Sequence, residues 1–232
     1  MCQRYTITAA ADKVKSRFNV DVPGVYSVRY NAAPTQVLPI ITNDDSEGVS
    51  FFYWGLIPSM AKNKSISPKL YNARIEDVTK KASFKYSLRH RRCLVISDGY
   101  YDWKITGKKS KVPYRVTLNN QEPYAMAGLW EEYEDDENET VHTFTIVTVP
   151  SNDLLSDLND YMPAILKPED EKGWLNNELD LNDHLKMLTT YDAGLISKYT
   201  VSPMINRVDI DSAELIKNCA PADQFGNYTL FD

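Results

Sequence analysis

The chain is poor in the residues that build disulfide frameworks and metal centres. Its 232 residues include only three cysteines and three histidines. Cys2, Cys93 and Cys219 are odd in number and widely spaced, which argues against both a disulfide framework and a zinc knuckle. Since the histidines and cysteines lie in no ligand spacing, we expect no metal and no other cofactor. Free thiols indicate a reducing compartment, and we expect the protein to be cytoplasmic.

Long hydrophobic segments, internal repeats and low-complexity linkers are missing as well. Apolar runs such as residues 125–129 are far too short to cross a bilayer, so we expect no membrane partner. The N-terminal segment has no hydrophobic signal core, which argues against secretion. Hydrophobic residues make up 43% and charged residues 25% of the chain, as in ordinary globular proteins. We therefore expect one domain over residues 1–232.

Charge is distributed unevenly along the chain. The net charge is −6, which by itself argues against a nucleic-acid partner. Residues 62–111, however, hold fourteen basic and four acidic residues, a balance of +10. Such a segment can attract a polyanion locally, because salt screens the acidic remainder beyond about 8–10 Å. The alternative is that these lysines and arginines are scattered over the surface and form no patch.

Hydrophobic periodicity predicts many short strands with a few helices. The expected helices cover residues 12–18, 78–89, 153–159, 168–176 and 183–188. The expected strands cover residues 37–41, 48–54, 92–97, 100–105, 114–118, 126–133 and 142–149. This pattern favours an α+β fold, with peripheral helices around a mainly antiparallel sheet or open pseudo-barrel.

Cys2 directly follows the initiator methionine. Met1 is normally removed when the next side chain is small, and its removal would leave an amine and a thiol on one residue. The amine can condense with an aldehyde, after which the sulfur closes a five-membered thiazolidine ring. An α-amine titrates near ~7.7–8.0 and a thiol near ~8.5, so both reactive forms are accessible at neutral pH. The alternative is that Cys2 follows Met1 by chance.

Five segments in order carry a family resemblance. They are residues 1–4 (MCQR), 54–58 (WGLIP), 71–74 (YNAR), 92–103 (RCLVISDGYYDW) and 162–166 (MPAIL). Together they resemble the SRAP family (SOS response-associated peptidase), and residues 201–206 look like the family's closing strand. The resemblance implies a single SRAP-type domain that senses abasic sites in single-stranded DNA. It also implies a stable covalent link between an N-terminal cysteine and the deoxyribose aldehyde, and association with the nucleoid when DNA is bound.

Several site residues follow from this resemblance. Cys2 matches the family's nucleophile, and Asn72 matches its active-site asparagine, whose amide both donates and accepts hydrogen bonds. Arg4 and Arg74 match arginines that hold phosphates, for which a planar guanidinium is well shaped. A plain turn residue is the alternative for Asn72, and structural salt bridges are the alternative for the two arginines.

Pro34 and Trp54 match positions that stack against bases beside the lesion. Aromatic stacking of this kind contributes about 1–3 kcal/mol per base. For Trp54, ordinary packing in the hydrophobic core is the alternative.

The chain departs from the family pattern at three positions. Asp102 stands where the family has glutamate, and the shorter side chain changes the reach of its carboxylate. Asn159 stands where the family has histidine, and Tyr161 where it has arginine. An asparagine cannot move a proton near neutral pH, which is the particular use of histidine. Ring formation by Cys2 is therefore expected, whereas ring opening and strand cleavage depend on Asp102, Asn159 or the adjacent Asp160.

Three functions remain open from the sequence. The first is covalent capture of abasic sites with lyase-like chemistry, which protects damaged DNA. The second is an N-terminal-nucleophile (auto)peptidase in which the amine of Cys2 activates its own thiol. The third is a diverged, non-catalytic nucleic-acid-binding module.

Overall fold

The barrel at the centre of the molecule is built from five strands. The computed structural model describes residues 2–62, 69–134 and 138–228. The barrel strands are β3 (Val37–Thr42), β4 (Ser50–Trp54), β6 (Arg92–Ser97), β9 (Tyr124–Glu134) and β10 (Thr140–Pro150). All neighbours pair antiparallel except β4 and β10, which run parallel. Pairing of β9 with β10 closes the ring. The expected α+β fold with mainly antiparallel strands is therefore confirmed, whereas the barrel is closed and not open as expected.

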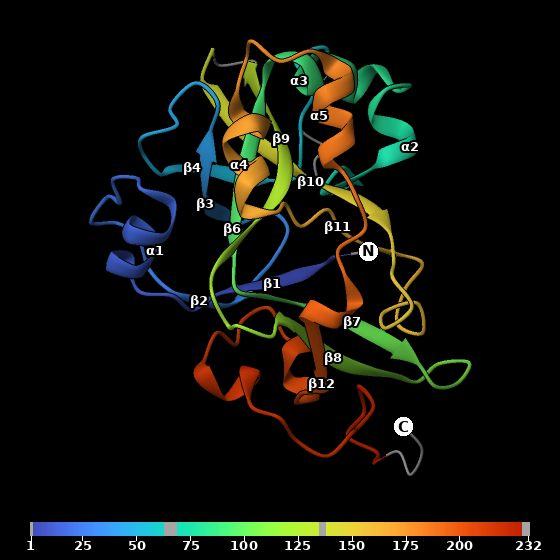
Figure 1. Ribbon diagram of the computed structural model, residues 1–232. Coiled ribbons are helices and arrows are strands. Elements are labelled where there is room, and N and C mark those ends of the chain that lie inside the picture. Colours follow the sequence, from blue (N-terminus) through green and yellow to red (C-terminus); the bar gives the residue numbers. More distant parts are fainter. Residues whose placement is uncertain (1, 63–68, 135–137, 229–232) are drawn as a thin grey trace.

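Two short strands, β5 (Asn72–Arg74) and β11 (Tyr161–Pro163), add to β10. A second sheet lies below the barrel in Figure 1 and contains five antiparallel strands. In order across this sheet they are β12 (Ile196–Thr200), β8 (Lys111–Leu118), β7 (Gly99–Ile105), β1 (Arg4–Ile7) and β2 (Arg29–Ala32). Only Asp98 separates β6 from β7, so the chain passes directly from the barrel into this sheet.

The helices lie on the outside of the barrel (Figure 1). They are α1 (Ala11–Phe18), α2 (Ile75–Val78), α3 (Ala82–His90), α4 (Pro168–Leu175) and α5 (Leu181–Met187), followed by the 3-10 helices η2 (Ala193–Leu195), η3 (Pro203–Asn206) and η4 (Ala213–Ile216). In α3, Phe84 and Leu88 lie one turn apart and are both buried, as their spacing predicts. No helix in the described part of the chain is long and apolar enough to cross a membrane.

Two expected helices differ from the structure. The helix expected over residues 78–89 is interrupted, because the backbone N–H groups of Lys80 and Lys81 both donate to the carbonyl of Asp77 in a turn. The backbone of Lys81 is then extended, and α3 begins one residue later. Residues 153–159 form successive turns around Asn152 and Leu155, and no helix propagates from them.

The last strand of the second sheet also lies elsewhere than expected. It covers residues 196–200, whereas residues 203–206 form a 3-10 helix. Pro203 has no N–H to donate to a ladder, and Ser202 accepts a hydrogen bond from the N–H of Met204 instead.

Arg92 is a fully buried cation that ties two helices to the barrel. Its Nη1 donates to the carbonyls of Leu88 at 3.1 Å and Arg89 at 2.6 Å, where α3 ends. Its Nε donates to the carbonyl of Trp174 at 2.8 Å and its Nη2 to Oδ1 of Asn177 at 2.7 Å, where α4 ends. The guanidinium thus satisfies carbonyls that two helix ends would otherwise leave unpaired.

Candidate functional site

Cys2 lies directly before β1 and is fully buried. Its Sγ donates to the carbonyl of Arg4 at 3.6 Å. Burial, with a smaller contribution from the nearby carboxylate of Asp102, raises the pKa of the Cys2 thiol to about 12. At neutral pH the sulfur is therefore a neutral thiol, and its reaction requires a group that takes its proton.

Asn72 is in direct contact with Cys2. It is the first residue of β5, which β10 positions by parallel pairing opposite Ile146. The side-chain Nδ2 of Asn72 donates to the backbone carbonyl of Cys2 at 2.6 Å. The Oδ1 of the same amide is buried and has no hydrogen-bond partner among the described residues. The structure therefore brings Cys2 and Asn72 together and leaves one acceptor beside them unused.

Asp102 and Asn159, two of the three positions that depart from the family pattern, also contact each other. Asp102 lies on β7, and Asn159 lies in the turns before β11. The Nδ2 of Asn159 donates to Oδ1 of Asp102 at 3.2 Å, and the backbone N–H of Trp103 donates to the same oxygen at 2.9 Å. Burial nonetheless raises the pKa of Asp102 above its ordinary value. The carboxylate thus lies near Cys2 with a stronger affinity for a proton than an exposed aspartate has.

The two arginines differ in their surroundings. Arg4 is half-buried, and its Nη1 donates to the carbonyl of Gln3 at 3.0 Å, while its Nε is buried without a partner. Arg74 is exposed, and its guanidinium lies 4.6 Å from the centre of the Tyr161 ring. Neither arginine forms an ion pair within the part of the chain that the structure describes, which argues against the salt-bridge alternative.

Trp54 does not lie where a base could stack on it. The side chain is fully buried, its ring centre is 5.0 Å from that of Tyr5, and its Nε1 donates to the carbonyl of Tyr71 at 2.8 Å. The expectation that Trp54 stacks with bases is therefore wrong, and core packing describes this residue. Pro34 is half-buried in the turn between β2 and β3, and its stacking role stays a prediction.

A carboxylate that the sequence analysis did not single out fixes the strand after Cys2. Buried Asp98 accepts hydrogen bonds from Oγ1 of Thr6 at 2.6 Å and from the backbone N–H of Ala9 at 2.9 Å. Arg115 from β8 donates its Nη2 to both Thr6 and Asp98, at 2.9 Å and 3.2 Å. This network holds β1 against β7, and hence holds Cys2 near Asp102. The dipeptide Asp98-Gly99 is a turn signal in the sequence, but such a signal does not reveal this role.

Two buried tyrosines also lie close to Cys2, and the sequence motifs do not identify them as site residues. Tyr5 and Tyr100 are both buried, and burial raises the pKa of each hydroxyl well above its ordinary value. Each lies close enough to Cys2 to interact with its charge. Both come from the paired strands β1 and β7, where they face each other in register. Only this pairing identifies them as neighbours of the thiol.

The closed barrel, the five-stranded antiparallel sheet and the outer helices define a protein of the α+β class. In it, a buried cysteine is held by an asparagine amide close to a carboxylate. The chain belongs to the SRAP family, because the family model described as SOS response associated peptidase (SRAP) matches residues 1–208. The resemblance inferred from the five segments is thus confirmed.

Named relatives cover most of the chain. It is 39% identical to the abasic site processing protein YoqW of Bacillus subtilis over 94% of this chain and all of the relative. It is 30% identical to the abasic site processing protein HMCES of Rattus norvegicus, over 87% of this chain and 67% of the relative. A crystal structure of a Bacteroides thetaiotaomicron protein superposes with a TM-score of 0.88 at 27% identity, covering 94% of this chain and all of that one.

Proposed function

We propose that this protein processes abasic sites in single-stranded DNA by covalent capture through Cys2 after removal of Met1. The observation that carries the proposal is the 2.6 Å hydrogen bond from Asn72 to the carbonyl of Cys2, because it holds the N-terminal residue in one orientation. The names of relatives that share most of the chain support abasic-site DNA as the substrate.

The reaction needs no oxidant and no cofactor. The amine of Cys2 adds to the sugar aldehyde and loses one water to form an imine. The thiol then adds across the C=N bond, its sulfur binding the carbon and its proton passing to the nitrogen. Asp102 is suited to carry that proton, because a carboxyl with a raised pKa is a better acid–base group near neutral pH. Asn72, with its unused acceptor, is suited to hold the sugar or the amine.

Arg4 and Arg74 would bind phosphates on either side of the lesion, with Pro34 against a neighbouring base. Neither guanidinium forms an ion pair among the described residues, which supports this role because no carboxylate takes the place of a phosphate there. Asn159 would orient Asp102 without moving a proton itself.

The test is a denaturing gel of protein incubated with single-stranded DNA that carries one abasic site. Mass spectrometry first establishes that Met1 has been removed. We expect an adduct that disappears in Cys2→Ala and forms more slowly in Asn72→Ala. The control is Cys219→Ala, because Cys219 is an exposed thiol without an adjacent amine and its loss should leave the adduct unchanged.

Other outcomes identify the alternatives. Absence of an adduct from protein with a free Cys2 amine contradicts the proposal. Salt-sensitive binding without a covalent product would indicate a non-catalytic module. A peptide product that depends on Cys2 would indicate the (auto)peptidase. Asn159→His should accelerate loss of the adduct, and an unchanged rate would show that Asn159 does not occupy the position of a proton carrier.

A further inference from the structure

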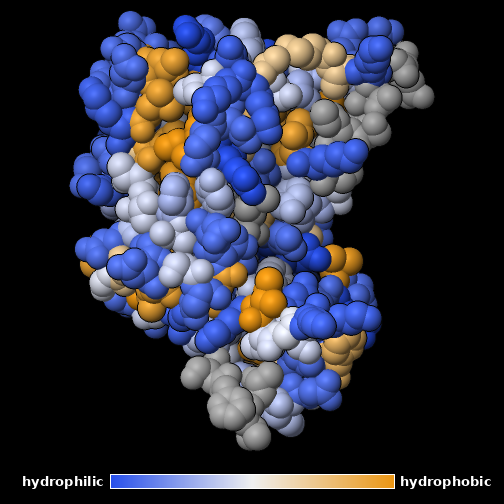
Figure 2. Space-filling view, turned by 90° about the vertical axis from the view of Figure 1, so that its right-hand side faces the viewer, coloured by the Kyte–Doolittle hydropathy of each residue, from blue (hydrophilic) through white to orange (hydrophobic). Residues whose placement is uncertain are grey.

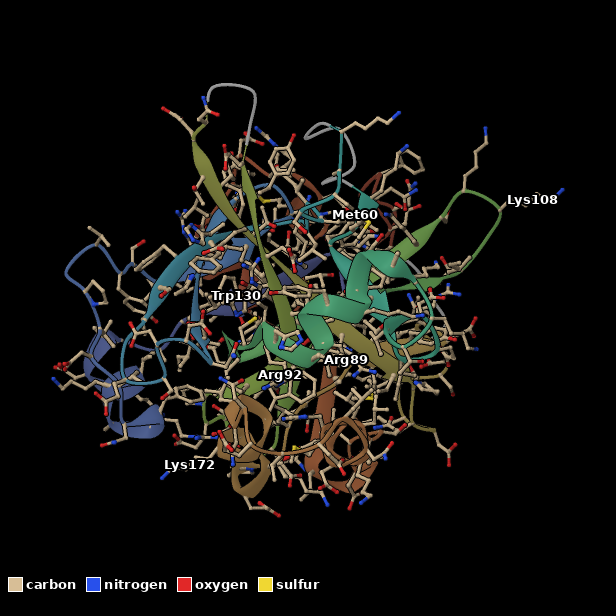
Figure 3. All side chains as sticks on the ribbon, turned by 90° about the horizontal axis from the view of Figure 1, so that it is seen from above. Met60, Arg89, Arg92, Lys108, Trp130 and Lys172 are labelled. Carbon is tan, nitrogen blue, oxygen red and sulfur yellow. The ribbon has the colours of Figure 1, made fainter. Side chains whose placement is uncertain are left out.

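One face of α3 carries a straight line of positive charge. Phe84 and Leu88 face the barrel, whereas Lys81, Lys85 and Arg89 are exposed at intervals of four residues. With a rise of about 1.5 Å per residue, neighbouring cations are about 6 Å apart along the helix. Figure 3 views this end of the molecule and shows α3 across the barrel, with Arg89 labelled on it. We call Lys81, Lys85 and Arg89 the α3 basic line.

This arrangement is unfavourable for the helix alone. Like charges four residues apart repel each other, and a lysine at the N-terminus opposes the helix dipole. The first turn of α3 contains no acidic residue that would compensate. Lys81 forms an ion pair with Asp77 at 2.9 Å, but Lys85 and Arg89 form none among the described residues. A polyanionic partner would remove this repulsion.

Two acidic residues of β9 lie beside α3 and share one cation. Glu131 and Glu132 pair with Arg91 at 3.2 Å and 2.6 Å, and Glu131 also accepts from the hydroxyl of Ser87 in α3. Arg91 offsets one of these two negative charges and Asp77 offsets Lys81, so one acidic charge remains against the two positive charges of Lys85 and Arg89. The line therefore presents a net positive field to solvent.

The chain connects this helix directly to the candidate site. Asn72 and Arg74 belong to β5, α2 follows without a gap, and exposed Lys80 then leads into α3. Lys81 comes seven positions after Arg74 along the chain, a reach of at most about 25 Å even if fully extended. Figure 1 shows α2 on the side of the molecule where the N-terminus lies, with α3 beyond it. In Figure 2, which views this side, hydrophilic residues predominate and apolar ones form smaller groups.

We propose that the α3 basic line binds the phosphate backbone of the DNA strand flanking the abasic site. This inference rests on the proposed function and extends it to a surface outside the covalent site. Evenly spaced cations on a rigid helix fit the evenly spaced phosphates of a strand, and such contacts are independent of base sequence. The line would hold the flank on the side of the lesion that Arg74 faces, and would leave the chemistry at Cys2 unchanged.

The test is charge reversal in Lys85→Glu/Arg89→Glu, measured with two strands that carry one abasic site. The short strand covers only the lesion and its immediate neighbours, and the long strand extends on both sides. We expect affinity for the long strand to fall about tenfold or more, with the slope of log K against log salt smaller by about 1.4, since each single-strand phosphate contact contributes about 0.7. Adduct yield on the short strand should not change.

The matched control is Lys108→Glu/Lys109→Glu in the hairpin between β7 and β8, which changes net charge equally at two exposed lysines of the second sheet (Figure 3). Equal loss of affinity in the control would overturn the inference, because net charge would then explain the effect. Unchanged long-strand affinity in the α3 variant would also overturn it. Lys85→Gln/Arg89→Gln, checked by thermal unfolding, provides a folded variant if charge reversal perturbs the helix. A wild-type protein that forms no adduct on either strand would instead contradict the proposed function.

Discussion

Replacing Trp54 with alanine removes an indole that packs between the two sheets of the molecule. The ring meets Tyr5 of β1 edge-on, with centres 5.0 Å apart, and stacks on Phe144 of β10, with centres 6.3 Å apart and an interplanar angle of 10°. Truncation of a fully buried tryptophan costs about 3–5 kcal/mol, and loss of the Nε1 donor to Tyr71 adds about 1 kcal/mol. For a chain of this length, each kcal/mol lowers Tm by about 2–4 °C, so we expect a decrease of about 8–24 °C.

Trp54→Phe separates packing from base stacking. Phenylalanine keeps an aromatic face but loses the Nε1 hydrogen bond and part of the volume, which we expect to cost about 1–3 kcal/mol. Thermal unfolding by circular dichroism measures this cost, and affinity for single-stranded abasic DNA is measured on the folded protein. We expect a lower Tm and unchanged DNA affinity.

The neighbouring residue provides the control. Tyr53 is 41% exposed on the opposite face of β4, so Tyr53→Ala should change stability by no more than about 1 kcal/mol. If Trp54→Phe weakened DNA binding without lowering Tm, the indole would have to be accessible to a base. That result would refute the assignment of Trp54 to the core.

Three further predictions concern buried charge and the exposed guanidinium. Burial raises the pKa of Asp102, so the folded protein binds a proton on this carboxyl more tightly than the unfolded chain does. The stability gained from this proton is present below pH about 3.8 and is lost as pH rises through the raised pKa. Asp102→Asn, which keeps an acceptor for Asn159, should therefore be more stable than wild type at neutral pH, and urea titrations should show the difference vanish in acid. Arg92→Met should lower the free energy of unfolding by about 3 kcal/mol or more, because each buried carbonyl left unpaired costs about 1–3 kcal/mol. An unchanged urea midpoint would contradict the structural role of Arg92. Tyr161→Ala should weaken DNA binding about two- to fivefold, because its exposed cation–π contact with Arg74 contributes about 0.5–1 kcal/mol. In an Arg74→Ala background, where this contact is already lost, Tyr161→Ala should have no further effect on binding.

The local pattern of hydrophobic residues predicts most of the strands, but it does not predict how the strands pair to close the barrel. Short apolar runs locate β3, β6 and β10 to within two residues at each end, because such a pattern depends only on neighbours in sequence. The parallel pairing of β4 with β10 joins segments about ninety residues apart, and no local signal specifies it. The helix expected over residues 153–159 does not form, although its local signal is present. Asn152 accepts a hydrogen bond from the N–H of Leu155 as a helix cap does, but the bonds that follow return to the carbonyls of Asn152 and Leu155 alone, so only turns form.

The site shows the same division. Cys2 and Asn72 belong to separate sequence motifs that predict site residues, and the structure places them in contact. Trp54 belongs to a third such motif, but its ring points into the core. A motif identifies a residue type at a position, whereas the face that a strand residue presents depends on the sheet around it.

The sequence by itself determined the family, the α+β class and the place of Cys2 directly after Met1, because these depend on residue types and their order. Only the tertiary structure decided that Asp102 and Asn159 form a hydrogen-bonded pair and that the side chain of Trp54 is fully buried. The physical reason is burial. Exposure, hydrogen-bond partners and the direction of a pKa shift belong to the surroundings of a side chain, and strands far apart in the chain supply those surroundings.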